Sequence, residues 1–232
     1  MKKRRLFILA TIGLFSCKQS STANQNIVDT PKLSSPKTVQ SQEPYQSLID
    51  TRYEYSYTEG GRVLIENSLS KGEQYTDPNG NEYFKTIFWS RIFNETDDSL
   101  ELKIDFPGDS YEVRALPGKY FKILVLPDTM SVDKVPLFNY GIDLKSFIDN
   151  SFHKPSSWKQ HINPKGSSGF YVVVLFDKGV GGPIRTGLSI KGQNLFYRVS
   201  RLDAMPAHSL MVEKEINCGS INLKNLVPLG VK

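Results

Sequence analysis

The side chains best suited to covalent chemistry in this 232-residue chain are its two cysteines, Cys17 and Cys218. A nucleophilic cysteine needs a nearby base, and the three histidines that offer one are His153, His161 and His208. They are too scattered to place two metal ligands on one helical face, and none belongs to a recognised cysteine-protease pattern. We therefore predict no catalytic residue, no metal site and no cofactor, and we expect Cys218 to be a small buried side chain on a strand.

Acidic side chains are the second source of possible chemistry. A glycosidase needs two carboxyl groups about 5–10 Å apart. Two pairs stand out: Asp97 with Asp98 in a predicted turn, and Glu213 with Glu215 on one face of a predicted strand. We interpret both pairs as solvated charges. A hydrolase built on an acid pair or on Cys218 is the alternative, so enzymatic activity stays an open question, with a non-enzymatic role favoured.

Two loops have the composition of ligand-binding loops. Asp77–Glu82 (Asp-Pro-Asn-Gly-Asn-Glu) has alternating oxygen-bearing side chains, as calcium loops do, but its glycine is at the wrong position and its flanks are strand-like. Gly179–Pro183 is glycine-rich and follows an apolar run, but it lacks the Lys-Ser/Thr ending of a phosphate-binding loop. We expect a hairpin connection in both places.

Aromatic side chains are the remaining candidates for a binding site. Five of them, Tyr53, Tyr55, Tyr57, Trp89 and Trp158, could form a stacking platform for sugar rings, since each has a flat apolar face and a polar tip. The other interpretation, which we favour, is that they pack the core of a β protein.

The elements that must position these residues are mainly strands. Apolar and polar residues alternate over 53–57 and over 100–106, as expected of strands with one buried face. Similar segments, separated by Gly, Pro and Asn turns, are 62–66, 83–93, 120–126, 170–176, 184–190, 195–201 and 216–223. Short strands with frequent turns predict a mainly β fold, an antiparallel β-sandwich.

One accessory helix is predicted over 143–152. Leu144, Phe147, Ile148 and Phe152 have helical spacing, and Asp143 is a suitable N-cap. Its single apolar stripe must pack on the sheets, and we expect it to close an open end of the sandwich.

The first seventeen residues carry a targeting pattern. Residues 2–5 are four cations, residues 6–15 are almost all apolar, and Ser16 and Cys17 follow, which is the order of a secretory signal. Those four cations account for most of the formal charge of +5, since the remaining 25 Lys and Arg face 24 Asp and Glu. The rest of the chain is near neutral, which argues against nucleic acid as a partner.

The segment Leu14-Phe15-Ser16-Cys17 resembles the lipobox of bacterial lipoproteins. The resemblance implies cleavage between Ser16 and Cys17, a diacylglycerol thioether and an acylated amine on Cys17, and hence a lipid-anchored protein of the cell envelope. The other interpretations are an ordinary signal peptide with an incidental cysteine, and an uncleaved anchor. Once Cys17 is lipidated, only Cys218 remains, so no internal disulfide is expected.

Residues 18–44 contain fourteen Ser, Thr, Asn or Gln, three Pro and no aromatic residue. Such a segment cannot bury enough apolar surface to order itself, so we predict a disordered tether with a reach of roughly 30 Å. The arrangement resembles the envelope lipoproteins of Bacteroidetes-like bacteria, which implies an outer-membrane location, periplasmic or surface-facing. The predicted division is therefore 1–16 signal peptide, 17–44 lipidated cysteine and tether, and 45–232 sandwich domain.

The stretch from Trp89 to Pro107 resembles the strand, Asn-x-Thr turn and alternating strand of bacterial Ig-like sandwich domains. That resemblance concerns the fold and implies no activity. We therefore expect a non-enzymatic binding or assembly module for an envelope protein or glycan; the alternative is an envelope hydrolase.

Overall fold

The computed structural model describes residues 45–114, 116–202 and 210–231, and of 210–212 the backbone only. The predicted signal peptide, Ser16, Cys17, the tether and His208 lie outside these residues. Every described element belongs to the unit Gln42–Lys232. In the described part of the chain, no helix is long and apolar enough to cross a membrane.

The described elements are thirteen strands, one α-helix and three 3-10 turns, with bounds η1 Gln46–Leu48, β1 Ile49–Tyr57, β2 Arg62–Ser68, β3 Lys71–Thr76, β4 Glu82–Asn94, β5 Leu100–Phe106, β6 Ser110–Glu112, β7 Tyr120–Thr129, η2 Val132–Lys134, η3 Phe138–Gly141, α1 Leu144–Ser151, β8 Ser156–Ile162, β9 Ser167–Asp177, β10 Ile184–Lys191, β11 Asn194–Leu202, β12 Leu210–Ile221 and β13 Leu226–Val231.

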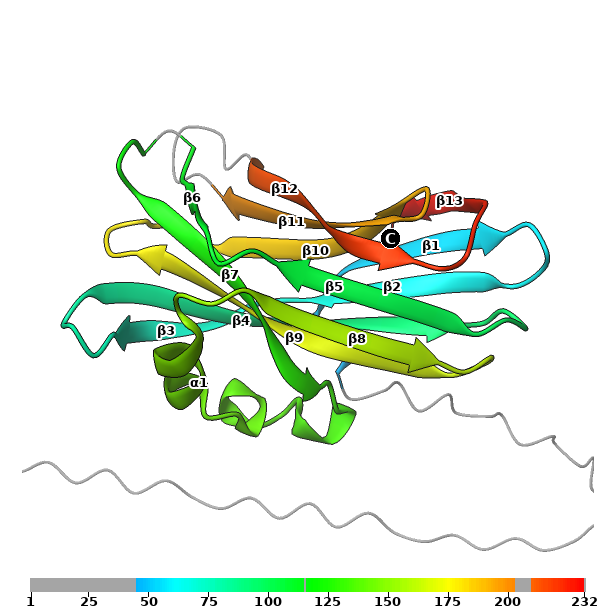
Figure 1. The fold of residues 1–232 in the computed structure, drawn as a ribbon, viewed down its shortest axis with the longest axis horizontal. Helices are drawn as coiled ribbons and strands as arrows, with labels where there is room; N and C mark the ends of the chain where they lie inside the picture. The colour runs from blue at the N-terminus through cyan, green and yellow to red at the C-terminus, as the bar shows by residue number, and fades with distance from the viewer. Residues whose placement is uncertain (1–44, 115, 203–209, 232) are drawn as a thin grey trace, which may run out of the picture. The chain divides into compact units, whose positions relative to one another are not determined.

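The strands form two antiparallel sheets (Figure 1). Sheet A has the order β13-β1-β2-β4-β9-β7-β6, with β3 also paired to β4, and sheet B has the order β10-β11-β12-β5-β8. A mainly β fold with antiparallel sheets, predicted from the alternating segments, is confirmed. Four strands, β3, β6, β8 and β13, were not among the predicted segments.

The sandwich core lies between the two sheets and explains the alternation in the sequence. On β5, Leu100, Leu102, Ile104 and Phe106 are buried in it, while Glu101 and the other intervening residues face out. The core draws side chains from both sheets, so it holds them face to face.

A second apolar cluster covers the opposite face of sheet A. This outer cluster consists of Tyr45, Tyr75, Ile87, Trp89, Leu124, Leu126, Met130, Val135, Tyr140, Leu144, Ile148, Tyr171, Val173 and Leu175. On β9 the even-numbered residues 170–176 face the sandwich core and the odd-numbered ones face the outer cluster. The apolar run of β9 is continuous because both of its faces are covered.

The helix is where the sequence predicted it, but in a different place in the fold. α1 begins after Asp143, whose side chain accepts a hydrogen bond from the Ser146 backbone N–H. Leu144 and Ile148 are buried in the outer cluster. The expectation that the helix closes an open end of the sandwich is therefore wrong: the helix and the turns before it form a layer on the outer face of sheet A (Figure 1).

One of the two ligand-like loops is a hairpin turn, as predicted. Asp77 lies between β3 and β4, and its Oδ1 accepts hydrogen bonds from the backbone N–H groups of Asn79 and Asn81 at 2.9 and 2.8 Å. A hydrogen bond from the Asn81 side-chain amide, together with these backbone bonds, holds the pKa of Asp77 below its usual value. The oxygens that a cation would use thus stabilise the turn.

The glycine-rich loop Gly179–Pro183 is not a hairpin connection. It carries the chain from β9 in sheet A to β10 in sheet B. Gly182 has a φ of +99°, and a Cβ at that position would lie far inside contact distance of the Leu202 carbonyl oxygen. The glycine is there because the backbone crosses the edge of the sandwich too closely for a side chain.

A buried amide joins the two sheets at the free edge of β10. Asn67 on β2 accepts the Leu188 N–H through Oδ1 at 2.8 Å and donates from Nδ2 to the Leu188 carbonyl at 3.2 Å. Its Oδ1 also accepts from Ser90 at 2.7 Å, and its Nδ2 lies 3.2 Å from the Thr51 hydroxyl. The side chain therefore takes the place of a neighbouring strand and satisfies an edge that would otherwise be unpaired.

Candidate functional site

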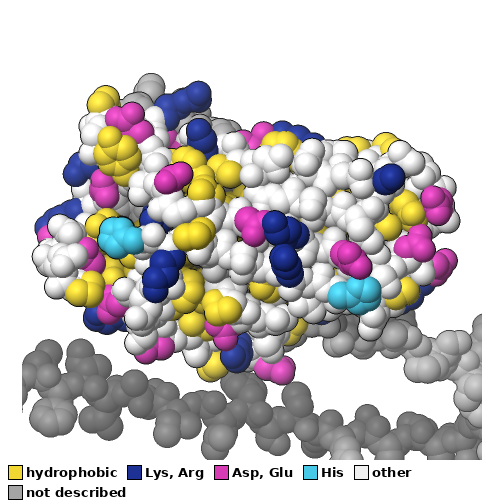
Figure 2. Space-filling model, in the orientation of Figure 1, with side chains coloured by type: hydrophobic (Ala, Val, Ile, Leu, Met, Phe, Trp, Pro, Cys, Tyr) yellow, Lys and Arg dark blue, Asp and Glu magenta, His cyan; other side chains and the backbone are white. Residues whose placement is uncertain are grey.

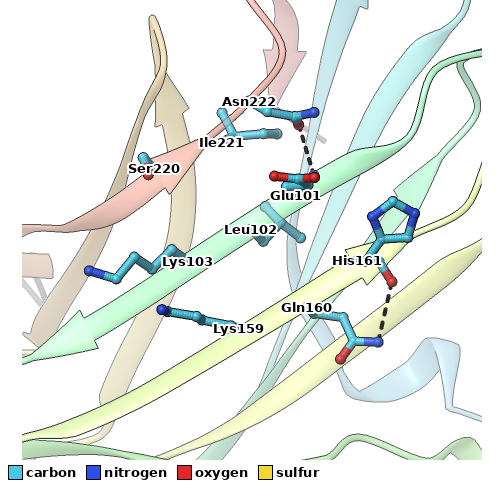
Figure 3. Close-up of a pocket in the computed structure, with 9 residues that line it drawn as sticks. All are labelled: Glu101, Leu102, Lys103, Lys159, Gln160, His161, Ser220, Ile221 and Asn222. Carbon is cyan, nitrogen blue, oxygen red and sulfur yellow. Dashed lines mark hydrogen bonds between the residues drawn. The ribbon is translucent and has the colours of Figure 1, made fainter.

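The candidate site is an open groove of about 520 Å³ on the outer face of sheet B, across β12, β5 and β8. Its lining residues, all drawn in Figure 3, are Glu101, Leu102, Lys103, Lys159, Gln160, His161, Ser220, Ile221 and Asn222. Figure 2 shows the same face of the body, with cationic side chains gathered near the middle of the view over β5 and β8 and acidic ones beside them. The groove is thus an open surface presented by three strands, where charged and polar side chains lie beside the apolar Leu102 and Ile221.

The alternation of β5 and β8 aims the groove side chains outward. Leu102 and Trp158 are buried in the core, so Lys103 and Lys159, each the next residue along its strand, face solvent. The two lysines are directly opposite each other in the β5–β8 register, and Glu101 is opposite His161 in the same register. Side chains on adjacent paired strands are held more precisely than side chains on loops.

Asn222 fixes one end of the groove. Its Oδ1 accepts a hydrogen bond from the Glu101 backbone N–H at 2.8 Å, and its Nδ2 donates to the Ser99 carbonyl at 2.9 Å. The amide is therefore engaged with the backbone on both sides. It joins the end of β12 to the start of β5 and keeps the floor of the groove in place.

The groove lining carries two lysines, Lys103 and Lys159, and one carboxylate, Glu101. Lys103 has a carboxylate partner, Asp105, at 2.8 Å, whereas in the described ranges no carboxylate lies within 4.0 Å of Lys159. Like charges directly opposite each other on paired strands are unfavourable. An acceptor-rich group placed between Lys103 and Lys159 would relieve that repulsion, with Ser220 nearby as a further hydrogen-bonding group.

The histidine and the serine of the groove do not form a nucleophile–base pair. Ser220 is on β12 and His161 on β8, with β5 between them. Since neighbouring strands lie about 4.8 Å apart, these two side chains start about 10 Å apart, well beyond hydrogen-bond reach. Figure 3 shows them on opposite sides of the groove.

Cys218 is the small buried side chain that the sequence predicted. It is 2% exposed, and its thiol lies 3.4 Å from the Leu195 carbonyl, to which it donates. Burial raises the pKa of the Cys218 thiol to about 12. The thiolate needed for nucleophilic chemistry is therefore disfavoured near neutral pH.

Three of the four acids in the predicted pairs form ion pairs, and the expectation that both pairs are solvated is wrong for the buried Glu213. Glu213 is buried and forms an ion pair with Arg201 at 3.0 Å, whereas Glu215 is exposed and pairs with Lys191 at 2.6 Å. A register shift in β12 beside Glu213 separates their environments, so they do not act as one pair on one face. Asp97, for its part, pairs with Lys165 at 2.7 Å in the turn after β4.

The predicted stacking platform is wrong for three of its five residues. Tyr55, Trp89 and Trp158 are 3%, 0% and 4% exposed, and buried rings offer no face to a sugar. Trp89 lies in the outer cluster and Trp158 in the sandwich core, on opposite sides of sheet A. Tyr53 and Tyr57 are half-buried against the core, and the Tyr53 hydroxyl accepts a hydrogen bond from the Arg198 side chain. The favoured interpretation, aromatic packing of a β core, holds for the buried three.

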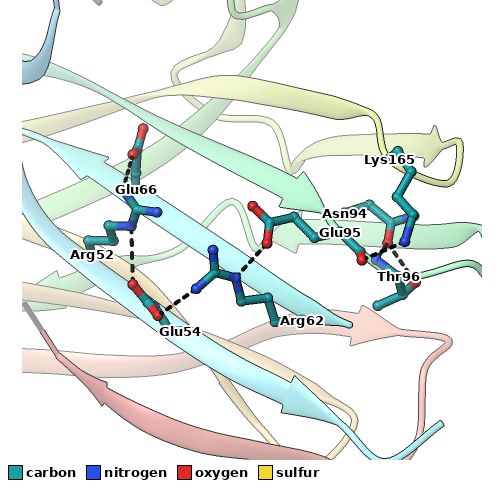
Figure 4. Close-up of polar contacts among 8 residues, drawn as sticks. All are labelled: Arg52, Glu54, Arg62, Glu66, Asn94, Glu95, Thr96 and Lys165. Carbon is teal, nitrogen blue, oxygen red and sulfur yellow. Dashed lines mark hydrogen bonds and ion pairs between the residues drawn. The ribbon is translucent and has the colours of Figure 1, made fainter. Parts of the chain in front are cut away.

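A ladder of ion pairs crosses the outward face of β1 and β2 (Figure 4). Arg52 lies 3.5 Å from Glu54 and 3.4 Å from Glu66, and Arg62 lies 3.3 Å from Glu54 and 2.5 Å from Glu95. Each carboxylate in the ladder forms an ion pair with at least one guanidinium. We interpret the ladder as cross-strand stabilisation of sheet A.

The Asn-x-Thr turn noted in the sequence is the other polar cluster of Figure 4. Asn94 is fully buried; its Nδ2 donates to the carbonyls of Asp98, Ile162 and Asn163, and its Oδ1 accepts from Thr96. The turn joins β4 in sheet A to β5 in sheet B. Its residues are structural.

Sequence reasoning missed the groove because it missed β8. The segment from Ser156 to Ile162 does alternate, with Trp158 and Ile162 facing the core, but Gln160 interrupts the apolar face. His161, which the sequence analysis considered as a possible base, lies on this strand. The described residues contain no group of three or more His, Cys, Asp or Glu that could hold a metal ion.

Comparison with protein-family models, with curated proteins and with solved structures found no match for the chain.

Proposed function

We propose that this protein is a membrane-anchored envelope lipoprotein whose β body acts as a non-enzymatic binding module for an envelope protein or glycan. The observation that carries the binding role is the polar groove on sheet B. It places Lys103, Lys159 and Ser220 side by side on rigid strands, open to solvent. The anchor rests on the lipobox-like segment that ends at Cys17.

The proposed ligand surface is anionic or rich in hydroxyl groups. Two lysines that face each other attract phosphate, carboxylate or sulfate groups, and Ser220 and His161 add hydrogen-bonding capacity at the two sides. An acidic segment of an envelope protein and an acidic glycan both offer such groups. We also propose that the body is an Ig-like sandwich domain, in which the two sheets are a scaffold for a surface site.

The groove is tested by site-directed crosslinking in intact cells. A photoreactive residue at Ser220 should give a defined adduct, and the double substitution Lys103→Glu with Lys159→Glu should abolish it. Asn217, exposed on the same strand, is the matched control position. Equal adducts from both positions, or an adduct that survives the charge reversal, would argue against the groove as the binding site.

The anchor is tested separately with labelled palmitate. The wild-type chain should incorporate it and Cys17→Ala should not, because the thioether requires the sulfur. Equal labelling of the two chains would end the lipoprotein proposal. Protease treatment of intact cells then distinguishes a surface-facing from a periplasmic location.

A further inference from the structure

The most exposed large apolar side chain in the described residues is at the tip of the layer that covers sheet A. Phe138 is 74% exposed and its neighbour Leu137 is 49% exposed, while Tyr140, two residues on, is fully buried in the outer cluster. Leu137 and Phe138 are consecutive, so they form a small exposed apolar projection, whereas one scattered apolar side chain would need no explanation.

The loop that presents Phe138 is held rigidly. The Lys71 ammonium donates to the carbonyls of Val135 and Leu137 at 2.6 and 2.8 Å and lies 4.1 Å from the centre of the Tyr140 ring. The Asn139 side chain donates to Glu73 at 2.7 Å. The loop is therefore fixed from β3 on one side and from the outer cluster on the other.

This rigidity maintains an unfavourable backbone. Asn139 and Tyr140 have φ values of 45° and 57°, and the following residue, Gly141, has 68°. Left-handed backbone at a large non-glycine residue such as Tyr140 persists only where the surroundings enforce it, and such positions cluster at binding sites. Here the surroundings include the Tyr171 ring, stacked on Tyr140 with centroids 5.2 Å apart.

The chain enters the body on this same face. Tyr45, the first described residue, is buried in the outer cluster and packs edge-to-face on Trp89 with ring centroids 5.6 Å apart. The 27 residues between Cys17 and Tyr45, which their composition predicts to be a tether, would then reach roughly 30 Å. A lipid on Cys17 would therefore hold the outer-cluster face, of the two broad faces of the body, close to a bilayer.

We infer that the body docks on the membrane through Leu137 and Phe138, which insert at the boundary between headgroups and acyl chains, and that the groove on sheet B faces away from the bilayer. This inference rests on the proposed lipid anchor. Two apolar side chains bind a bilayer weakly on their own, but a tether turns docking into an intramolecular step with a high effective concentration. The tether's entry point favours a lipid surface over an apolar pocket in another protein.

The test uses the lipidated protein, reconstituted in vesicles of phosphatidylethanolamine and phosphatidylglycerol that contain brominated phosphatidylcholine. In Phe138→Trp, the new indole should be quenched by the brominated chains and its emission shifted to the blue. In the control Asn217→Trp, on the outer face of sheet B, the new indole should not be quenched and its emission should not shift to the blue. The native Trp89 and Trp158 are buried and supply the same background in both variants.

A second arm removes the dependence on the anchor. The chain from Lys18 onward, without a lipid, should partition weakly onto the same vesicles, and Phe138→Ser should lower its partition coefficient roughly tenfold, the fold-change expected when one phenylalanine is no longer buried. Because Phe138 is exposed, thermal melting of this variant should be unchanged.

Each outcome decides the inference. If the protein floats with the vesicles but the indole of Phe138→Trp is not quenched, the docking is refuted and the anchor is not. Equal quenching of Phe138→Trp and Asn217→Trp has the same meaning. A blue shift without quenching places Phe138 against protein and also refutes it. A chain that carries no lipid and does not float refutes the proposed anchor. In the lipid-free arm, a partition coefficient of Phe138→Ser equal to that of wild type refutes the docking.

Discussion

Replacing Asn67 tests how the two sheets are joined. In Asn67→Leu, a side chain of similar size, the buried Leu188 N–H and carbonyl lose the groups that satisfy them at 2.8 and 3.2 Å, and the Ser90 hydroxyl loses its acceptor at 2.7 Å. Each buried polar group left without a partner costs about 1–3 kcal/mol. We expect a loss of about 3 kcal/mol in the free energy of unfolding, which counts the two Leu188 groups. The Ser90 hydroxyl is not counted, because it can rotate to another acceptor.

Such a loss is large against a total stability of roughly 5–15 kcal/mol for a domain of this size. It should be measured by denaturant unfolding of the chain without its leader and lipid, followed by tryptophan fluorescence, which reports on Trp89 in the outer cluster and Trp158 in the sandwich core. Asn217→Leu, at an exposed position, is the control and should stay within about 0.5 kcal/mol of wild type.

A second substitution, Asn67→Asp, separates the hydrogen bonds from packing. Burial should hold the pKa of the introduced carboxyl above its unfolded value of about 3.9, so the protonated form is the one that suits the fold. That form can accept from the Leu188 N–H and donate to the Leu188 carbonyl, as the amide does. Its stabilising effect is complete below the unfolded pKa and is lost as pH rises through the folded pKa.

The difference in unfolding free energy between Asn67→Asp and Asn67→Leu should therefore favour the aspartate in acid and decline towards neutral pH. The reasoning fails if Asn67→Leu costs no more than the exposed control, or if that difference does not change with pH.

Three further substitutions test other parts of the fold. Gly182→Ala should destabilise the chain by about 1–3 kcal/mol through its positive φ and backbone contact, while Gly181→Ala, where a Cβ meets nothing within 4 Å, should have little effect; denaturant unfolding compares the two. Cys218 should resist a maleimide in the folded protein and react with it after unfolding. Because folding raises the pKa of the Cys218 thiol from 9.0 to about 12, its contribution to stability is lost as pH rises between those values. In Cys218→Ala, the unfolding free energy should therefore fall less steeply with pH in that range. Arg201→Met should cost about 3–5 kcal/mol by leaving the buried Glu213 carboxylate without its cation. Glu213→Gln should cost a similar amount, because it leaves the buried Arg201 guanidinium without its anion, and denaturant unfolding measures both.

The parts of the fold that were predictable are those set by neighbours in the chain. The alternation of 100–106 reports a strand with one buried face, and the spacing of Leu144 and Ile148 after Asp143 reports a capped helix. Each signal depends on a few adjacent residues, because side-chain direction follows from local backbone geometry. The same is true of the turn at Asp77, whose bonds reach only four residues along the chain.

The position of the helix was not predictable from its own stripe. An apolar stripe says that a surface must be covered and does not say which surface. The missing information was in the apolar run 170–176: a strand buried on both faces needs a layer on each side of its sheet. Reading that run together with the helix would have placed α1 on the outer face of sheet A.

The groove depends on pairings that local patterns do not encode. Lys103 and Ser220 come together because β5 pairs with β12, more than a hundred residues further along the chain, and Lys159 joins them from β8. The bridge from Asn67 to Leu188 likewise joins residues 121 apart. Contacts at such separation are fixed by the assembled core, so a single sequence names the residues without naming their neighbours.

The two outer faces of the sandwich differ in a way that follows from this assembly. The outer face of sheet A carries residues such as Ile87, Val173 and Leu175, which need a cover, and the segment 131–152 supplies one. The outward residues of β5 and β8 are charged or polar, so the corresponding face of sheet B needs no cover and lies open to solvent. The two broad faces of the body are therefore not equivalent: one is covered by a layer of chain and the other is open to solvent. If the covered face, where the chain enters at Tyr45, is turned to the bilayer, the bare face is the one free to meet a partner, and the membrane orientation and the binding groove become two consequences of one arrangement of layers.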